Sequence, residues 1–144
     1  MNTETSKSLS SPFFSVIIAA YNRANLISRA LDSLVNQTEQ DWEAIIVDDG
    51  STDNTYPGIF PYLKFYPGIK YIRQPHKGGA YSKNSGIKAA SGKFITFLDS
   101  DDEYHPLHLG SRKSKLLENT SVKFLYGGGK VLGNQYVPDR FNPL

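Results

Sequence analysis

Four acidic side chains lie within five residues, directly after an apolar run. The run covers residues 94–98, and the acids that follow are Asp99, Asp101, Asp102 and Glu103. Like charges this close repel one another, so each makes it harder to ionise its neighbours. A divalent cation removes that cost, and carboxylates shared with substrate phosphates are usual ligands of Mg²⁺. The pattern therefore indicates a site for Mg²⁺ or Mn²⁺.

Other interpretations of this region stay open from the sequence alone. The acids could form a turn that caps the next helix, because Asp and Glu favour helix N-termini. Asp99 and Asp101 point to one face only if the strand continues through them, since side chains alternate along a strand. A turn that begins at Asp99 would break that alternation. His105 and His108 suggest zinc, but a zinc site needs three or four ligands, so we favour surface histidines.

Apolar runs that alternate with helical patterns organise the chain. Strands are expected at residues 14–20, 43–48, 69–73, 93–99 and 121–127. Helices are expected between them, over 21–37 with Asn22 or Asn25 as N-cap, within 54–67, over 78–92, and after Pro106, where Gly110 weakens the helix. This alternation predicts an α/β fold with a mostly parallel sheet and helices on both faces.

The composition is that of one globular domain. The chain has 144 residues, a net charge of +2 and no cysteine, which excludes a disulfide framework and a thiolate metal site. We expect residues 1–12 to be a disordered tail and 13–144 to be the domain. No dense basic run is interleaved with aromatics, so no nucleic-acid partner is expected. No apolar run approaches the roughly 20 residues of a membrane span.

Polar residues follow three of the expected strands. Tyr21 and Asn22 come at the end of the first strand, Asp48 and Asp49 at the end of the second, and Asp99 to Asp102 at the end of the fourth. Parallel strands end at one edge of a sheet, and ligands of open α/β sheets bind there. These side chains are therefore expected to share one site. Each also has a plain structural alternative: a core tyrosine, a helix cap or a turn.

A glycine-rich segment and a lysine fit the same site. Gly78 and Gly79 could bring backbone N–H groups close to a phosphate, or could only form a turn. Lys83, one turn further on, could neutralise that phosphate or be solvated. From Asn54 to Leu98 the chain has lysines and an arginine but no acid, and most of these cations are expected on a solvated face.

Three motifs in the same order resemble one known family. The segments "SVIIAAYNRANLISRALDSLVNQT", "WEAIIVDDGSTDNT" and "GKFITFLDSDD" are similar to the nucleotide-binding half of the family 2 glycosyltransferases. The resemblance extends from about Phe14 to Tyr126 and implies a Rossmann-like GT-A fold. It also implies transfer of a sugar from a nucleotide donor, usually UDP-linked, with inversion and with help from Mn²⁺ or Mg²⁺.

The resemblance assigns roles residue by residue. It implies that the nucleotide-binding residues are Ala19, Tyr21, Asp48, Asp49, Lys83 and Asp99. Tyr21 would stack on the base, Asp49 would hydrogen-bond it, and Asp48 would lie near the nucleoside. Asp101 would bind the metal directly, and Asp99 would contact the ribose or the metal. The supporting residues would be Gly78, Asn84 and Asp102.

The chain also departs from the family pattern. His76 stands where Asn is common and Lys83 where Arg is common, and lysine lacks the bidentate fork of arginine. The family's general base is an Asp or Glu in the second half of the domain. We expect that base beyond Leu144, so the 144-residue chain should be inactive by itself.

The resemblance places the full-length protein in the cytoplasm or at the inner face of the membrane, building polysaccharides, glycolipids or glycoproteins. Its acceptor would be a saccharide, a lipid-linked sugar or a protein. A non-catalytic nucleotide-sugar-binding module is the alternative. A sugar nucleotidylyltransferase fits less well, because "AAYNRAN" lacks the glycine-rich basic loop that holds a triphosphate.

Overall fold

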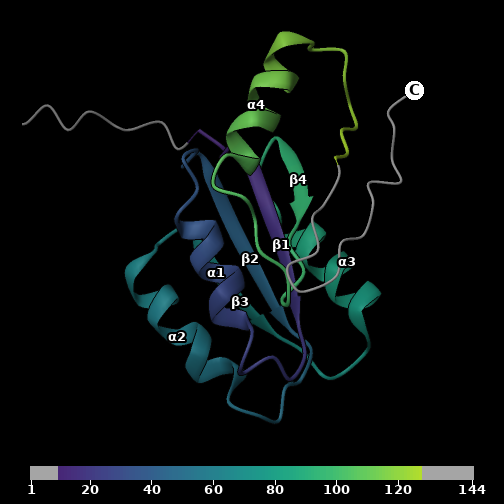
Figure 1. Ribbon diagram of the computed structural model, residues 1–144. Helices are drawn as coiled ribbons and strands as arrows, with labels where there is room; N and C mark the ends of the chain where they lie inside the picture. The colour runs from purple at the N-terminus through teal and green to yellow at the C-terminus, as the bar shows by residue number, and fades with distance from the viewer. Residues whose placement is uncertain (1–9, 128–144) are drawn as a thin grey trace, which may run out of the picture.

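A single parallel sheet forms the centre of the computed structural model, which describes residues 10–127 (Figure 1). Its strands run in the order β3-β2-β1-β4. Their bounds are β1 Phe14–Ala20, β2 Trp42–Asp48, β3 Ile69–Arg73 and β4 Phe94–Phe97. Every strand pair is parallel, and Ala20 lies opposite Asp48. The predicted α/β fold with a parallel sheet is confirmed.

Helices cover both faces of the sheet (Figure 1). Their bounds are α1 Ile27–Val35, α2 Thr55–Phe65, α3 Gly79–Ala89 and α4 His108–Glu118. One face of β1, with Val16 and Ile18, is buried in the same core as residues of α1, α2 and α4. The other face, with Ile17, packs on α3, where a Cβ on Gly86 would lie 2.4 Å from a methyl of Ile17. Alternate residues of β1 thus serve opposite layers, as strand geometry requires.

The predicted cap of α1 is wrong. The helix begins after Leu26, and no side chain caps it. Asn22 instead adopts a left-handed backbone, with φ of 51°, and its Oδ1 accepts a hydrogen bond of 2.8 Å from the N–H of Thr52. The N–H of Asn22 donates to Oγ of Ser51 at 3.0 Å. Asn22 therefore joins the loops that follow β1 and β2.

The predicted fifth strand is also wrong for residues 121–127. This segment has no strand pairing in the described chain, although Leu125 and Phe124 lie beside β4. Phe124 is 81% exposed, so the apolar residues that suggested a strand are not covered on both sides. The expected tail at residues 1–12 and the end of the domain at 128–144 lie largely or wholly outside the described residues.

A buried carboxylate joins the strands at the end of the sheet opposite to their carboxyl ends. Glu43 accepts hydrogen bonds from the hydroxyl of Ser15 at 2.6 Å and from Nζ of Lys70 at 2.7 Å. The N–H of Ser91 also donates to it, at 2.6 Å. Burial opposes ionisation, but these donors outweigh it and lower the pKa of Glu43 to about 2. This network links β1, β2, β3 and the entry to β4.

No helix within residues 10–127 is both long enough and apolar enough to cross a membrane.

Candidate functional site

A cavity of ≈ 390 Å³ lies at the carboxyl ends of β1, β2 and β4. The chain runs from β1 outward to β2 and β3 and then returns to place β4 on the other side of β1. Ligands of open α/β sheets bind at such a reversal of strand order. The predicted site residues among its lining are Ala19, Tyr21, Asp49, Lys83, Asp99 and Asp101. The three polar strand ends therefore meet, as their topology predicts.

The carboxylate of Asp49 holds the segment between β3 and α3. Its Oδ1 accepts from Nε2 of Gln74 at 2.8 Å and from the N–H of Lys77 at 2.9 Å. Its Oδ2 accepts from the N–H of Gly78 at 2.8 Å, and Gly78 has φ of 97°, which favours glycine. Asp49 is only 2% exposed; its burial opposes ionisation, but these donors keep its pKa below the usual value.

An imidazole fills the space beside Tyr21. The rings of Tyr21 and His76 are stacked, with centroids 4.1 Å apart and 25° between their planes. Nδ1 of His76 lies 2.8 Å from Oδ2 of Asp49 and 3.2 Å from its carbonyl oxygen. Both of these oxygens are acceptors, so Nδ1 carries the proton. His76 thus contacts both residues that the family resemblance assigns to the nucleotide base.

Asp48, in contrast, does not line the cavity. It is fully buried, and its Oδ2 accepts from the hydroxyl of Tyr71 at 2.5 Å, with a nitrogen of Arg73 4.0 Å away. Its Oδ1 accepts from the N–H of Ser51 at 2.8 Å. The three residues predicted to support the site, Gly78, Asn84 and Asp102, do not line the cavity either.

The acids after β4 lie on a turn. The strand ends at Phe97, and the N–H of Asp102 donates to the carbonyl of Asp99 at 3.0 Å. The strand therefore does not continue through Asp101, so alternation along a strand cannot be the reason that Asp99 and Asp101 lie together. The turn itself brings both Asp99 and Asp101 to the cavity and buries Ser100 between them. The helix-cap alternative is wrong, because α4 has no acid in its first turn.

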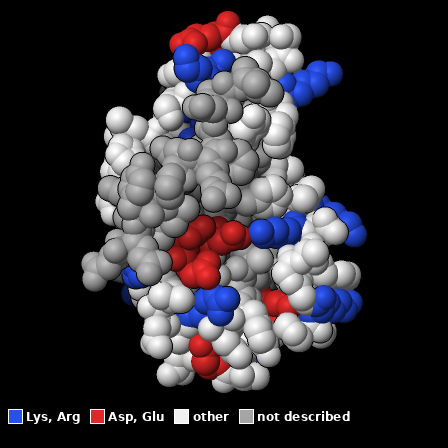
Figure 2. Space-filling view, turned by 45° about the vertical axis from the view of Figure 1, so that its right-hand side comes forward, with Lys and Arg blue, Asp and Glu red and all other residues white. Residues whose placement is uncertain are grey.

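Charge at this edge is only partly balanced. Acidic side chains gather in a patch with Lys or Arg beside it (Figure 2). Nζ of Lys83 lies 2.9 Å from Oδ1 of Asp99. Glu103 turns away from the cavity to Arg29 of α1, with Nε to Oε1 at 2.7 Å. Burial, together with the charges of Asp101 and Asp99, raises the pKa of Asp102. The turn therefore favours a cation.

The donor set of this turn fits a shared Mg²⁺ or Mn²⁺ ion. Residues 10–127 contain no group of three or more His, Asp or Glu suited to hold a metal alone. Two carboxylates, from Asp99 and Asp101, line the cavity beside Lys83. Mg²⁺ binds through one or two carboxylates and takes its other ligands from substrate phosphates and water. The structure does not support the zinc alternative, since the ring of His108 stacks on that of Tyr104, with centroids 3.7 Å apart.

Several lining residues were not predicted. They are Arg23, His76, Ser82 and Ser100, whereas Ala20 and Gly79, which also line the cavity, belong to segments that were expected at the site. Arg23 directly follows the Tyr21-Asn22 strand end, which is a signal that could have placed it at the site. Ser82 donates to the carbonyl of Gly78 and accepts from Gln74, so its place depends on the fold of the loop. No local sequence pattern reveals that placement.

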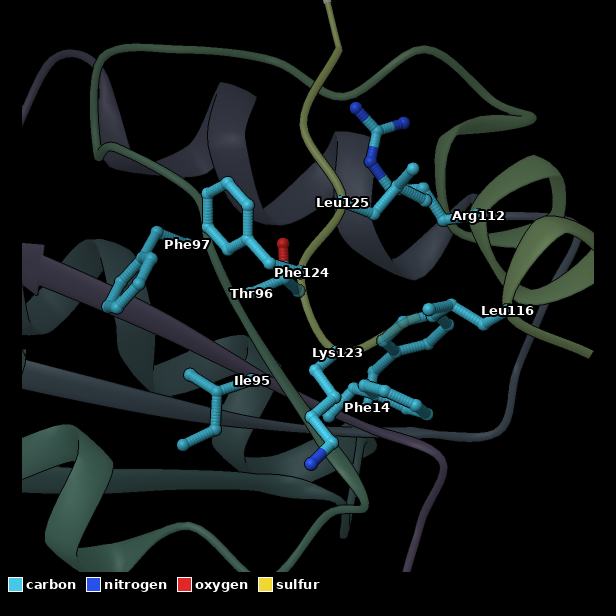
Figure 3. Close-up of a pocket in the computed structure, with 10 residues that line it drawn as sticks. Phe14, Ile95, Thr96, Phe97, Arg112, Leu116, Lys123, Phe124 and Leu125 are labelled. Atoms are coloured by element: carbon cyan, nitrogen blue, oxygen red, sulfur yellow. The ribbon is translucent and has the colours of Figure 1, made fainter. Parts of the chain in front are cut away.

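A second cavity, of ≈ 170 Å³, lies between β4, α4 and the segment after α4 (Figure 3). Its walls are mainly apolar and include Phe14, Phe94, Phe97, Leu116 and Phe124. None of its lining residues lines the first cavity. Its polar lining residues are Thr96, Arg112 and Lys123.

A parallel α/β sheet with a polar cavity at its switch point is typical of nucleotide-binding domains. The chain belongs to glycosyl transferase family 2, whose family model matches residues 15–132.

Relatives and solved structures agree with that membership. UDP-Glc:alpha-D-GlcNAc-diphosphoundecaprenol beta-1,3-glucosyltransferase WfgD of Escherichia coli is 36% identical over 88% of this chain and 49% of its own length. Staphylococcus aureus TarS 1-349, solved with UDP-GlcNAc, has a TM-score of 0.69 and 32% identity over 73% of this chain and 31% of its own. The mannosyltransferase PcManGT of Pyrobaculum calidifontis, solved with GDP-Man and Mn²⁺, has a TM-score of 0.67 and 25% identity, covering 74% and 32% of the two chains. The chain therefore spans about half or less of these proteins.

Proposed function

We propose that this chain is the donor-binding part of an inverting, metal-dependent glycosyltransferase that uses a UDP-sugar. One observation carries the proposal. In a member of glycosyl transferase family 2, a single cavity brings together Tyr21, Asp49, Lys83 and the Asp99–Asp101 turn. An aromatic ring, a carboxylate, a cation and a pair of metal-binding acids are the groups needed for a base, a ribose and a diphosphate.

Each group has one task in this proposal. Tyr21 stacks on the base and Asp49 accepts from its ring N–H, while Ala19 lines the same part of the cavity. Lys83 neutralises the charge of the diphosphate. Its ammonium already forms an ion pair with Asp99, so it lies beside the proposed metal site. Asp101 and Asp99 hold a Mn²⁺ or Mg²⁺ ion, which acts as a Lewis acid that stabilises the departing diphosphate. Asp102, Gly78 and Asn84 support these contacts.

The described residues leave the general base unassigned. That base must lie within hydrogen-bond reach of the acceptor hydroxyl. The carboxylates that line the cavity already have other roles: Asp49 holds a loop, and Asp99 and Asp101 hold the metal. As the family resemblance implies, we place the base beyond Leu144 and expect the 144-residue chain to bind donor without turning it over. The acceptor would be a saccharide, a lipid-linked sugar or a protein.

Calorimetry of the 144-residue chain with UDP tests the proposal. We expect weak binding that becomes tighter when Mn²⁺ is present, because the metal links the acids to the diphosphate. Circular dichroism should show in parallel that the chain is folded. A folded chain that releases no heat with UDP and Mn²⁺ would overturn the proposal, and so would rapid sugar transfer by this chain alone.

A further inference from the structure

His76 makes the two contacts that a nucleotide base would make at this site. Its ring lies 4.1 Å from that of Tyr21, within the range of stacked aromatic pairs. Nδ1 of its ring lies 2.8 Å from Oδ2 of Asp49 and is hydrogen-bonded to the backbone carbonyl oxygen of Asp49 at 3.2 Å. Uracil also offers a flat ring with a ring N–H. The imidazole therefore resembles the base in shape and in placing a ring N–H beside Asp49.

The carboxylate of Asp49 is crowded while His76 is in place. A carboxylate offers about four acceptor positions. The side chain of Gln74 and the N–H groups of Lys77 and Gly78 donate to it, and Nδ1 of His76 lies 2.8 Å from its Oδ2. Lys77 and Gly78 cannot give up their contacts unless the backbone moves. The ring of His76, in contrast, can leave the carboxylate by a movement of its side chain alone.

We propose that His76 is an internal competitor of the nucleotide base. Its ring must leave Tyr21 and Asp49 before a base can take the same contacts, so His76 lowers the affinity for the donor. This inference rests on the proposed function, because it concerns the base of the same UDP-sugar. His76 then sets the affinity of the donor site without contacting the bound donor.

The displacement needs only a side-chain rotation. The His76 side chain is 56% exposed, so its ring can turn toward solvent without crossing the core. The backbone, in contrast, is held close to the loop after β2. A Cβ on Gly50 would lie 3.1 Å from the backbone nitrogen of His76 and 3.2 Å from the backbone carbonyl oxygen of Gln74. The loop therefore stays in place while the imidazole moves.

Two substitutions separate the ring from its hydrogen bond. His76→Ala removes both contacts and should tighten UDP binding about tenfold, the effect of losing one stacked and hydrogen-bonded competitor. His76→Phe keeps a ring on Tyr21 but cannot donate to Asp49, and should remain close to the wild type. His105→Ala, at an exposed histidine that does not line the cavity, is the matched control and should not change affinity.

Calorimetry with UDP and Mn²⁺ measures the UDP affinity of the wild type and of each variant. Tighter binding by His76→Ala alone supports the competitor. Weaker or equal binding by His76→Ala overturns it, because the ring would then sandwich the base or play no part. His76→Phe binding as tightly as His76→Ala also overturns it. If UDP binds neither the wild type nor His76→Ala, the proposed function fails and this inference fails with it.

NMR tests the free state without any nucleotide. The ring protons of His76 should be shifted upfield by the Tyr21 ring, and Tyr21→Ala should remove that shift. UDP added to the wild type should also remove it, as the imidazole leaves. Ring protons with no Tyr21-dependent shift in the free chain would overturn the inference while leaving the proposed function intact.

Discussion

Nζ of Lys83 and Oδ1 of Asp99 lie 2.9 Å apart, and both residues line the cavity of the candidate site. The Lys83 ammonium also lies 5.6 Å from the centre of the Phe97 ring. The side chains of Lys83 and Asp99 are 38% and 54% exposed, so this ion pair by itself adds little to the stability of the fold. The relationship matters for ligands, because a diphosphate and a metal ion can exchange partners with the two side chains.

Replacing Lys83 should separate phosphate binding from base binding. Lys83→Ala is expected to weaken UDP binding about tenfold, since one charge-assisted contact is lost. Binding of uridine, which carries no phosphate, should not change. Competition experiments by ligand-observed NMR would measure both affinities. Lys88→Ala, an exposed lysine on the same helix, is the control, and equal losses for UDP and uridine would contradict the role given to Lys83.

The acidic turn contains its own matched pair of variants. Asp101→Ala should abolish the gain in UDP affinity that Mn²⁺ produces, because it removes a direct ligand. Glu103→Gln should leave that gain unchanged, since Glu103 pairs with Arg29 rather than facing the cavity. Calorimetry with and without Mn²⁺ measures the difference. A metal effect that survives in Asp101→Ala would remove this residue from the metal site.

Close packing at the start of β4 should make one glycine irreplaceable. A Cβ on Gly92 would lie 2.6 Å from the backbone nitrogen of Ser15 and 2.7 Å from the carbonyl carbon of Phe14. We expect Gly92→Ala to lower the free energy of unfolding by about 3 kcal/mol, because backbone atoms cannot move aside easily. Gly79→Ala, where a Cβ meets nothing within 4 Å, is the stability control. Urea denaturation would rank the two, and equal stabilities would contradict the steric account.

The buried carboxylate of Glu43 should make stability depend on pH. Its pKa falls from 4.5 to about 2 on folding, so its contribution is complete above pH 4.5 and is lost as the pH falls toward 2. Glu43→Gln is expected to cost roughly 2 kcal/mol at pH 7 and much less near pH 2. Denaturation at both pH values measures this. The exposed Glu118 provides the control substitution, and a cost that does not shrink in acid would argue against the ion pair with Lys70.

Sequence patterns predicted the sheet and its polar edge, because the apolar runs that form β1 and β2 are local in the sequence and are buried almost throughout. The positions of Tyr21, Asp49 and Asp99 at one edge then followed from parallel topology. The stack of His76 on Tyr21 could not be predicted in this way, because it depends on how a loop folds over Asp49. The apolar residues of 121–127 misled the strand prediction, since Phe124 is exposed rather than paired in a sheet.

Asn22 and Asp49 have a kinetic consequence. Asn22 ties the loop after β1 to that after β2, and Asp49 ties the latter to the entry of α3. The walls of the cavity are thus formed before any nucleotide arrives, and only side chains such as His76 and Lys83 need to turn. Side chains reorient within nanoseconds, whereas loop rearrangements extend to microseconds and beyond. Donor association with the described residues should therefore not wait for a rearrangement of the loops that Asn22 and Asp49 hold.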